Sequence, residues 1–102
     1  MKTYTGSRTI DGLRILVDGA PLDERYDLKR FTKGGFEWTY EGAGPSQLAL
    51  ALLADHLGDD QAALAGTDGF MRKVVANLAN DWTLTSQGID DALAAAEGGK
   101  ST

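Results

Sequence analysis

The sequence contains no cysteine, one histidine and two prolines among its 102 residues. Without cysteine the chain cannot form a disulfide framework, a thiolate zinc site or a cysteine nucleophile. The absence of cysteine is also compatible with a reducing compartment. A single histidine leaves little material for general acid–base catalysis, which needs a base, a nucleophile and usually an orienting acid in one place. The composition therefore argues against an enzyme of these common types.

Long apolar runs are also missing. The longest, residues 48–54, is far shorter than the roughly 20 residues that a membrane-spanning helix needs. The first residues, MKTYTGSRTIDG, contain no apolar segment of the kind found in a secretory signal. We therefore expect a cytoplasmic protein that does not enter a membrane.

Basic side chains are too few for direct binding of nucleic acid. Residues 1–41 carry seven basic and seven acidic side chains, whereas residues 42–102 carry three basic and eight acidic ones. The second part therefore supplies the whole formal net charge of −5. A nucleic-acid backbone requires a basic footprint that releases counterions. An excess of acid serves solubility, or it meets a basic surface on a partner protein.

The first part of the chain predicts an antiparallel sheet. Two alternating runs, residues 3–10 and 13–17, flank Asp11-Gly12, a strong hairpin signal. A two-residue turn there would pair Ile10 with Leu13. The core face would then consist of Tyr4, Ile10, Leu13, Ile15 and Val17, with Arg8 unexpectedly among them. We predict a third strand at residues 36–40 and a short fourth strand at residues 82–84.

The second part predicts helices. Residues 45–57 are apolar nearly all round, which is typical of a helix buried on most sides, and Gly58 would end it. Further helices are predicted at residues 59–65, 70–79 and 89–97, the first capped by Asp59 and the last by Ser86. Together these patterns predict one α+β domain over residues 1–97, followed by a flexible tail at residues 98–102. Its architecture would be a three- to four-stranded antiparallel sheet with a buried central helix and two or three further helices on one face.

The glycine loop Gly42-Ala43-Gly44-Pro45-Ser46 admits two interpretations. A glycine loop that leads from a strand into a helix can cradle phosphate through free backbone N–H groups. Here Pro45 removes one N–H, no lysine follows in the first helical turn, and Glu41 would repel a phosphate. We therefore favour a simple helix start. The alternative is a small-molecule or nucleotide-binding module that uses Arg8, Gly42, Gly44 and Ser46.

Other polar groups have simple structural explanations. Asp55, His56, Asp59 and Asp60 are ligand types for a hard metal, but they lack the alternating donors of a calcium loop, so we expect no metal and no cofactor. We expect Arg8 either to reach solvent at the sheet edge or to pair with Glu37 or Asp27. The basic residues 29, 30 and 33 are expected to lie on a solvated loop.

One block of residues resembles a known family. The segment Gly-Phe-Glu-Trp at residues 35–38, followed by Gly-Ala-Gly-Pro-Ser-Gln-Leu-Ala at residues 42–49, is similar to a small domain family of unassigned function from bacteria, archaea and their phages. The similarity extends to residues 4–8, 17–22 and 74–76. The resemblance implies no catalytic residue, and it implies a setting of small proteins carried by mobile elements.

That setting leads to a functional expectation. Small acidic proteins of mobile elements include inhibitors that block bacterial defence complexes by occupying basic surfaces, and fold or family analogy of this kind only suggests a function. We expect a non-enzymatic, anti-CRISPR-like binding protein that mimics nucleic acid in the cytoplasm of a bacterial host. The expected partner is a protein with a basic surface, possessing arginines and lysines that normally hold nucleic acid. The residues expected to contact it are Glu37, Glu41, Asp55, Asp59, Asp60 and Asp68.

Overall fold

A computed structural model describes the backbone of residues 2–101 and the side chains of residues 2–95. Four antiparallel strands form one sheet in the order β3-β2-β1-β4, with β1 at Thr3–Thr9, β2 at Gly12–Val17, β3 at Ala20–Pro21 and β4 at Trp82–Thr85. The helices are α1 at Ala43–Leu57, α2 at Asp60–Lys73, the short 3₁₀ helix η1 at Val75–Asn77 and α3 at Ser86–Ser101. The predicted α+β class, antiparallel sheet and buried central helix are confirmed.

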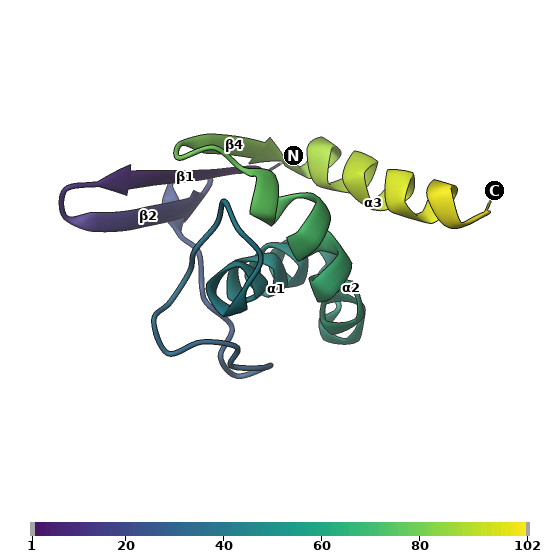
Figure 1. Cartoon of the computed structure of the whole chain (residues 1–102), viewed down its shortest axis with the longest axis horizontal. Coiled ribbons are helices and arrows are strands. Elements are labelled where there is room, and N and C mark those ends of the chain that lie inside the picture. Colours follow the sequence, from purple (N-terminus) through teal and green to yellow (C-terminus); the bar gives the residue numbers. More distant parts are fainter. Residues whose placement is uncertain (1, 102) are drawn as a thin grey trace.

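The elements form a body with two projections. In Figure 1, α1 and α2 lie below the sheet, the β1–β2 hairpin extends to one side and α3 extends to the other. The molecule consequently measures 45 × 24 × 24 Å along its principal axes. Within the described residues, none of the helices combines the length and the apolar character needed to cross a bilayer.

The hairpin has the predicted faces but not the predicted register. Its turn is formed by Ile10 and Asp11, so Thr9 pairs with Gly12 and Arg8 pairs with Leu13. The shift of two residues keeps the alternation of side chains, so Tyr4 and Ile15 still face the core. Ile10 and Leu13, both predicted in the core, are instead exposed: Ile10 fully, at the turn, and Leu13 beside it. Gly12 makes this turn possible because its φ of 120° is open mainly to glycine.

The predicted third strand at residues 36–40 does not form. Gly35 and Thr39 have φ values of 84° and 83°, which interrupt an extended backbone, and the N–H of Thr39 donates to the Val75 carbonyl at 3.2 Å. The additional strand is β3, a two-residue edge strand. Phe36 and Trp38 are buried as predicted, whereas Tyr40 is half exposed.

Helix α1 is the centre of the core. Every residue from Gly44 to Ala54 is buried, and Leu48, Leu50, Leu52 and Leu53 are inaccessible to solvent. Burial of a leucine side chain contributes roughly 2 kcal/mol, so these four contribute on the order of 8 kcal/mol before entropy is counted. Gly58 ends the helix with a φ of 66°, and its N–H donates to the Ala54 carbonyl, which confirms the predicted glycine cap.

Helix α2 is continuous, so the predicted division into separate helices at residues 59–65 and 70–79 is wrong. Thr67 is buried inside the helix, and its hydroxyl donates to the Ala63 carbonyl at 2.7 Å. Gly66 lets α2 approach α1 closely, because an added Cβ there would lie 3.2 Å from Leu53. The predicted Asp59 cap is confirmed by a bond of 3.1 Å from the Ala62 N–H to its carboxylate.

The C-terminal elements follow the prediction with one change of cap. Strand β4 forms, and Trp82 is buried. The hydroxyl that caps α3 belongs to Thr85, which accepts from the Gly88 N–H at 3.0 Å, whereas Ser86 accepts from the Lys2 N–H at 2.8 Å. Ile89 is fully buried. Helix α3 runs to Ser101, past the predicted end at residue 97, and the flexibility predicted for residues 98–102 stays a prediction.

Candidate functional site

Two of the six carboxylates expected to contact a partner stabilise the fold. Glu37 accepts from the Arg8 guanidinium at 2.8 Å. Asp55 accepts from the Tyr4 hydroxyl at 2.7 Å and from the Lys2 ammonium at 3.1 Å, and so ties the N-terminal strand to α1. Burial and the bond to Asp55 raise the pKa of Tyr4. The side chains of Glu37 and Asp55 are only 34% and 27% exposed.

The other four carboxylates lie in solvent along and beside α2. Glu41, Asp60 and Asp68 are 56%, 52% and 73% exposed, and Asp59 is also exposed. Asp68 and Glu41 both approach Arg72, at 3.0 and 3.6 Å. We call these four residues the α2 carboxylates.

Each α2 carboxylate has an intramolecular contact. Besides the pairs with Arg72, Asp60 lies 3.3 Å from Arg25, and Asp59 caps the helix. Arg25 also holds Asp27 at 3.0 Å. Exposed ion pairs of this kind contribute about 0–1 kcal/mol each. A competing cation can therefore replace them at small cost.

Arg8 lies in β1 and makes three hydrogen bonds. Its guanidinium donates to Glu37, to the Trp38 carbonyl at 3.2 Å and to the Asn80 side chain at 3.2 Å. It also stacks 4.5 Å from the centre of the Trp38 ring, a favourable cation–π geometry. The bond from Arg8 holds the pKa of the Glu37 carboxyl below its usual value, against the opposing effect of burial. Of the alternatives considered from the sequence, the pair with Glu37 is confirmed.

A tryptophan pair next to Arg8 was not anticipated from the sequence. The rings of Trp38 and Trp82 meet edge to face at 5.8 Å and 85°. Trp82 lies directly over Gly6, where an added Cβ would be 2.3 Å from the indole. Both indole N–H groups are buried without a hydrogen-bond partner among the described atoms. Gly6 inside a predicted strand was the signal that could have revealed this packing, because a glycine within a strand often marks the close approach of another group.

The glycine loop is packed as the start of α1. The Ser46 N–H donates to the Gly42 carbonyl at 3.0 Å, so it already has a partner. Gly44 rests on Glu37, and an added Cβ would lie 2.7 Å from the Cβ of that residue. Close packing therefore explains Gly44 without a ligand. Ser46 lines a cavity of about 260 Å³ with Lys29, Phe31, Leu64, Thr67 and Asp68, and Arg8 is not among its lining residues.

Gln47 is an important polar residue that sequence reasoning missed. It is fully buried, and its amide donates to the carbonyls of Glu24 at 2.7 Å and Lys29 at 3.0 Å. Its carbonyl accepts from the Phe31 N–H at 2.8 Å. This one side chain therefore fixes the long connection between β3 and α1. A single amide in an otherwise apolar helix was the signal that could have revealed it.

Comparison with known families identifies the chain. A model described as a family of unknown function, DUF6166, matches residues 4–95. The chain belongs to the DUF6166 family. No curated protein and no solved structure matches it significantly. The DUF6166 match runs from β1 into α3, so it includes the hairpin, the tryptophan pair and the α2 carboxylates.

The remaining polar groups of this DUF6166 domain do not converge. His56 pairs with Asp90 at 2.6 Å, so α1 and α3 are joined there. Asp55, Asp59 and Asp60 each have the separate partners described above. Among the described residues, no three side chains of metal-binding type come together. Lys29 and Arg30 stack on Phe31 and Tyr26 in the exposed connection.

Proposed function

We propose that this DUF6166 domain is a non-enzymatic binding protein that meets a basic surface on a protein partner. The observation that carries the proposal is the charge distribution, because residues 42–102 hold eight acidic and only three basic side chains. Opposite charge on the partner would accelerate encounter and select the correct face. The contact residues are the α2 carboxylates.

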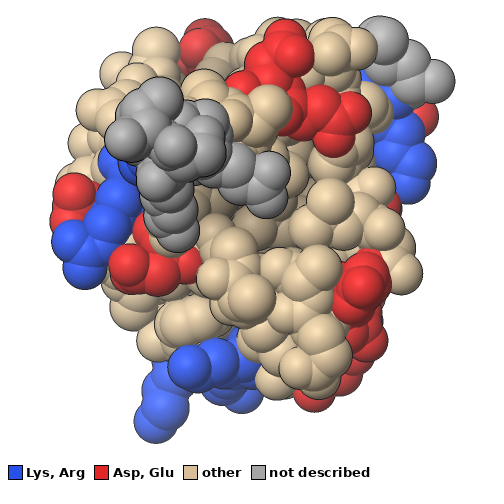
Figure 2. Space-filling model, turned by 90° about the vertical axis from the view of Figure 1, so that its right-hand side faces the viewer, with Lys and Arg blue, Asp and Glu red and all other residues tan. Residues whose placement is uncertain are grey.

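The weakness of the exposed ion pairs supports this assignment of the face. Seen from the side on which α3 ends, acidic side chains lie in several separate groups, and basic side chains lie toward the edges of the view (Figure 2). The ion pairs of Asp60 and Asp68 are exposed and weak, so arginines of a partner can exchange with Arg25 and Arg72. Glu37 and Asp55 are left out of the contact set because they stabilise the hairpin and the N-terminal strand.

The biological setting proposed is a mobile element in a bacterial host. The resemblance described from the sequence supports a small accessory protein that acts in the host cytoplasm. A basic surface that normally holds nucleic acid, as in a CRISPR or other defence complex, is the partner that a compact acidic domain fits best. Occupation of that surface would inhibit the complex by blocking nucleic acid, without any catalysed reaction.

A ligand-binding alternative has less support. It requires Arg8 and the loop of Gly42, Gly44 and Ser46 to face one ligand. The guanidinium of Arg8 is already bonded to Glu37, Trp38 and Asn80. Ser46 lines a cavity that Arg8 does not line, and Gly44 is covered by Glu37.

The proposal can be tested by quantitative affinity capture with two matched variants. The test variant carries Glu41→Gln, Asp59→Asn, Asp60→Asn and Asp68→Asn; asparagine caps a helix about as well as aspartate, so α2 is preserved. The control variant loses the same charge elsewhere, through the substitutions Asp11→Asn, Asp23→Asn, Asp81→Asn and Asp91→Asn. Both would be compared with the unmodified chain in nuclease-treated host lysate, with mass spectrometry as the readout.

The expected result is a defence or nucleic-acid-binding protein whose recovery falls at least tenfold with the test variant and less than twofold with the control. Equal recovery with both variants would reject the α2 carboxylates as the contact. Recovery of no nucleic-acid-binding protein at all would reject the proposed class of partner.

A further inference from the structure

The outer edge of β2 is open at the end nearest the hairpin turn. On this edge β2 pairs with β3 only through Leu16 and Val17, and one further bond joins the Leu22 N–H to the Ile15 carbonyl at 3.1 Å. Backbone groups alternate along an antiparallel strand, so the N–H and C=O of Leu13 point to the same edge as the Ile15 carbonyl. Among the described residues no strand pairs with Gly12–Ile15 on that side. An open edge of this kind is a template for an additional strand.

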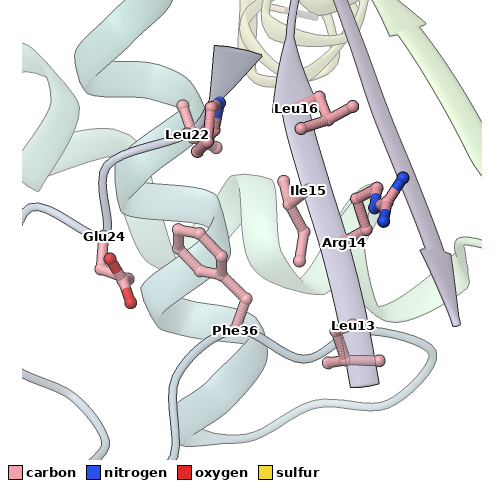
Figure 3. Close-up of a pocket in the computed structure, with 8 residues that line it drawn as sticks. Leu13, Arg14, Ile15, Leu16, Leu22, Glu24 and Phe36 are labelled. Carbon is pink, nitrogen blue, oxygen red and sulfur yellow. The ribbon is translucent and has the colours of Figure 1, made fainter. Parts of the chain in front are cut away.

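A groove runs along this open edge. Its volume is about 360 Å³, and it is lined by Leu13, Arg14, Ile15, Leu16, Pro21, Leu22, Glu24 and Phe36. In Figure 3, Ile15 and Phe36 face each other across the groove, and Glu24 lies on the side away from β2. Its apolar lining can receive a side chain from a strand that lies beside β2. Strand addition to a sheet edge takes affinity from the main chain and specificity from such pockets.

The charges at the groove define the chemistry of its occupant. Arg14 and Glu24 are its only charged lining residues, and neither has a salt bridge among the described residues. Glu24 therefore favours a basic side chain on the occupant, whereas the Arg14 side chain points to the opposite face of β2 from Ile15. Exposed Ile10 and partly exposed Leu13 at the end of the hairpin add apolar surface next to the open edge.

A second copy of the chain fits this edge poorly. If two β2 edges paired antiparallel about Leu13, both Arg14 side chains would lie on the same face of the joined sheet, close to each other on a diagonal. Like charges directly opposite each other destabilise a sheet, and diagonal neighbours are still within reach of side chains as long as arginine. The occupant is therefore a different sequence.

We propose that the open edge of β2 binds an extended segment of a partner protein by strand addition. One apolar side chain of that segment enters the groove between Ile15, Leu22 and Phe36, and a basic side chain lies opposite Glu24. This surface is separate from the α2 carboxylates, so the inference goes beyond the proposed function and does not depend on it.

The probe for this proposal is a random octapeptide library displayed on phage and selected against the immobilised full chain. Synthetic peptides of the recovered consensus would be measured by fluorescence anisotropy and by amide chemical shifts of the ¹⁵N-labelled protein. The expected consensus has an apolar residue next to lysine or arginine, and the largest shifts are expected at residues 12–16, 22 and 36. Methylation of the peptide backbone nitrogens should weaken binding at least tenfold at every second position, because only alternate N–H groups face β2.

Charge reversal at the groove provides the matched comparison. Glu24→Lys should weaken the peptide at least tenfold and should select acidic residues instead, whereas Asp81→Lys, an equal reversal elsewhere, should change affinity less than twofold. The quadruple α2 variant should bind the peptide normally, which separates this proposal from the proposed function. Failure to enrich any peptide, shifts centred elsewhere, or a uniform effect of methylation would each overturn strand addition. Micromolar self-association that protects Leu13 from hydrogen exchange would overturn the choice of occupant.

Discussion

At the scale of single residues, two glycines are fixed by what lies against them. Gly6 makes room for Trp82, and Gly44 makes room for Glu37. Neither position requires a positive φ, so the constraint is steric contact with a neighbour. The sequence presents both as ordinary glycines, one in a strand and one in a loop. The neighbours come from distant segments, so the constraint could not be read from local sequence alone.

Substitution of Gly6 by alanine should destabilise the domain. The added Cβ would be 2.3 Å from the Trp82 indole, whose ring is held by Trp38, so the pair must shift. Overpacking of this kind costs about 1–3 kcal/mol. Gly69→Ala is the control, since nothing lies within 4 Å of its Cβ position, and in a helix interior it should stabilise by roughly 0.5–1 kcal/mol. Urea unfolding followed by tryptophan fluorescence measures both; equal stability of the two variants would refute the contact.

Arg8 should control the acid stability of the hairpin through Glu37. The pKa of Glu37 is lowered in the folded protein, so the pair stabilises the fold above the ordinary carboxyl pKa. That stabilisation is lost as the pH falls through the lowered pKa. Arg8→Met keeps an apolar stem against Trp38 but removes the hydrogen bonds.

In the Arg8→Met variant we expect the Glu37 pKa to rise toward its ordinary value. We also expect the free energy of unfolding at acid pH to lose the pH dependence that this pair contributes. Carbon-13 NMR titration of the glutamate carboxyls measures the first effect, and urea unfolding between pH 2 and pH 6, a range of about two units on each side of an ordinary carboxyl pKa, measures the second. Arg14→Met, which removes an exposed arginine, should leave the Glu37 pKa unchanged. An unchanged Glu37 pKa in Arg8→Met would contradict the assigned cause.

At the scale of elements, the sequence predicts best where burial dominates. The apolar run of α1 and the glycine after it predicted the central helix closely. The errors arose where side chains override local propensity. Thr67 falls between two predicted helices, but its hydroxyl bonds within the single helix α2. Phe36 and Trp38 alternate as in a strand, but they lie in a loop that bends at Gly35 and Thr39. Such choices depend on tertiary contacts, which a periodic pattern does not contain.

The connection between β3 and α1 should depend on Gln47. Gln47→Leu keeps the volume of the side chain but leaves two part-buried carbonyls and one part-buried N–H without their partners. We expect a loss of roughly 2–4 kcal/mol in the free energy of unfolding, because unpaired buried polar groups cost about 1–3 kcal/mol each and the loop can relax toward water.

Hydrogen exchange provides the more specific measurement for Gln47. The Phe31 amide should lose its protection in Gln47→Leu, while amides inside α1 keep theirs relative to the global stability. Gln61→Leu, on the exposed face of α2, should leave the Phe31 amide unchanged. Protection of Phe31 that survives the loss of Gln47 would show that the loop is held by other contacts.

At the scale of the whole molecule, the net charge could be predicted from the sequence, but which carboxylates are free to contact a partner could be predicted only in part. The excess of acid in residues 42–102 follows directly from counting. Counting does not show whether a given carboxylate is available to a partner. Glu37 and Asp55, for example, are held by Arg8 and Tyr4 from strand β1. Contacts between segments so far apart in the chain leave no local signature. The candidate contact set is therefore smaller than composition alone suggested.

The most direct test of partner recognition through the α2 carboxylates is the rate of association with the captured partner, measured as a function of salt concentration. Steering between opposite charges should make the rate fall steeply between 50 and 500 mM salt, because the Debye length shrinks from roughly 14 to 4 Å over that range. The quadruple α2 variant should associate at least tenfold more slowly at 50 mM salt and show a much flatter dependence, while the matched control variant follows the unmodified chain. A rate that is insensitive to salt, or equally sensitive in both variants, would contradict recognition through the α2 carboxylates.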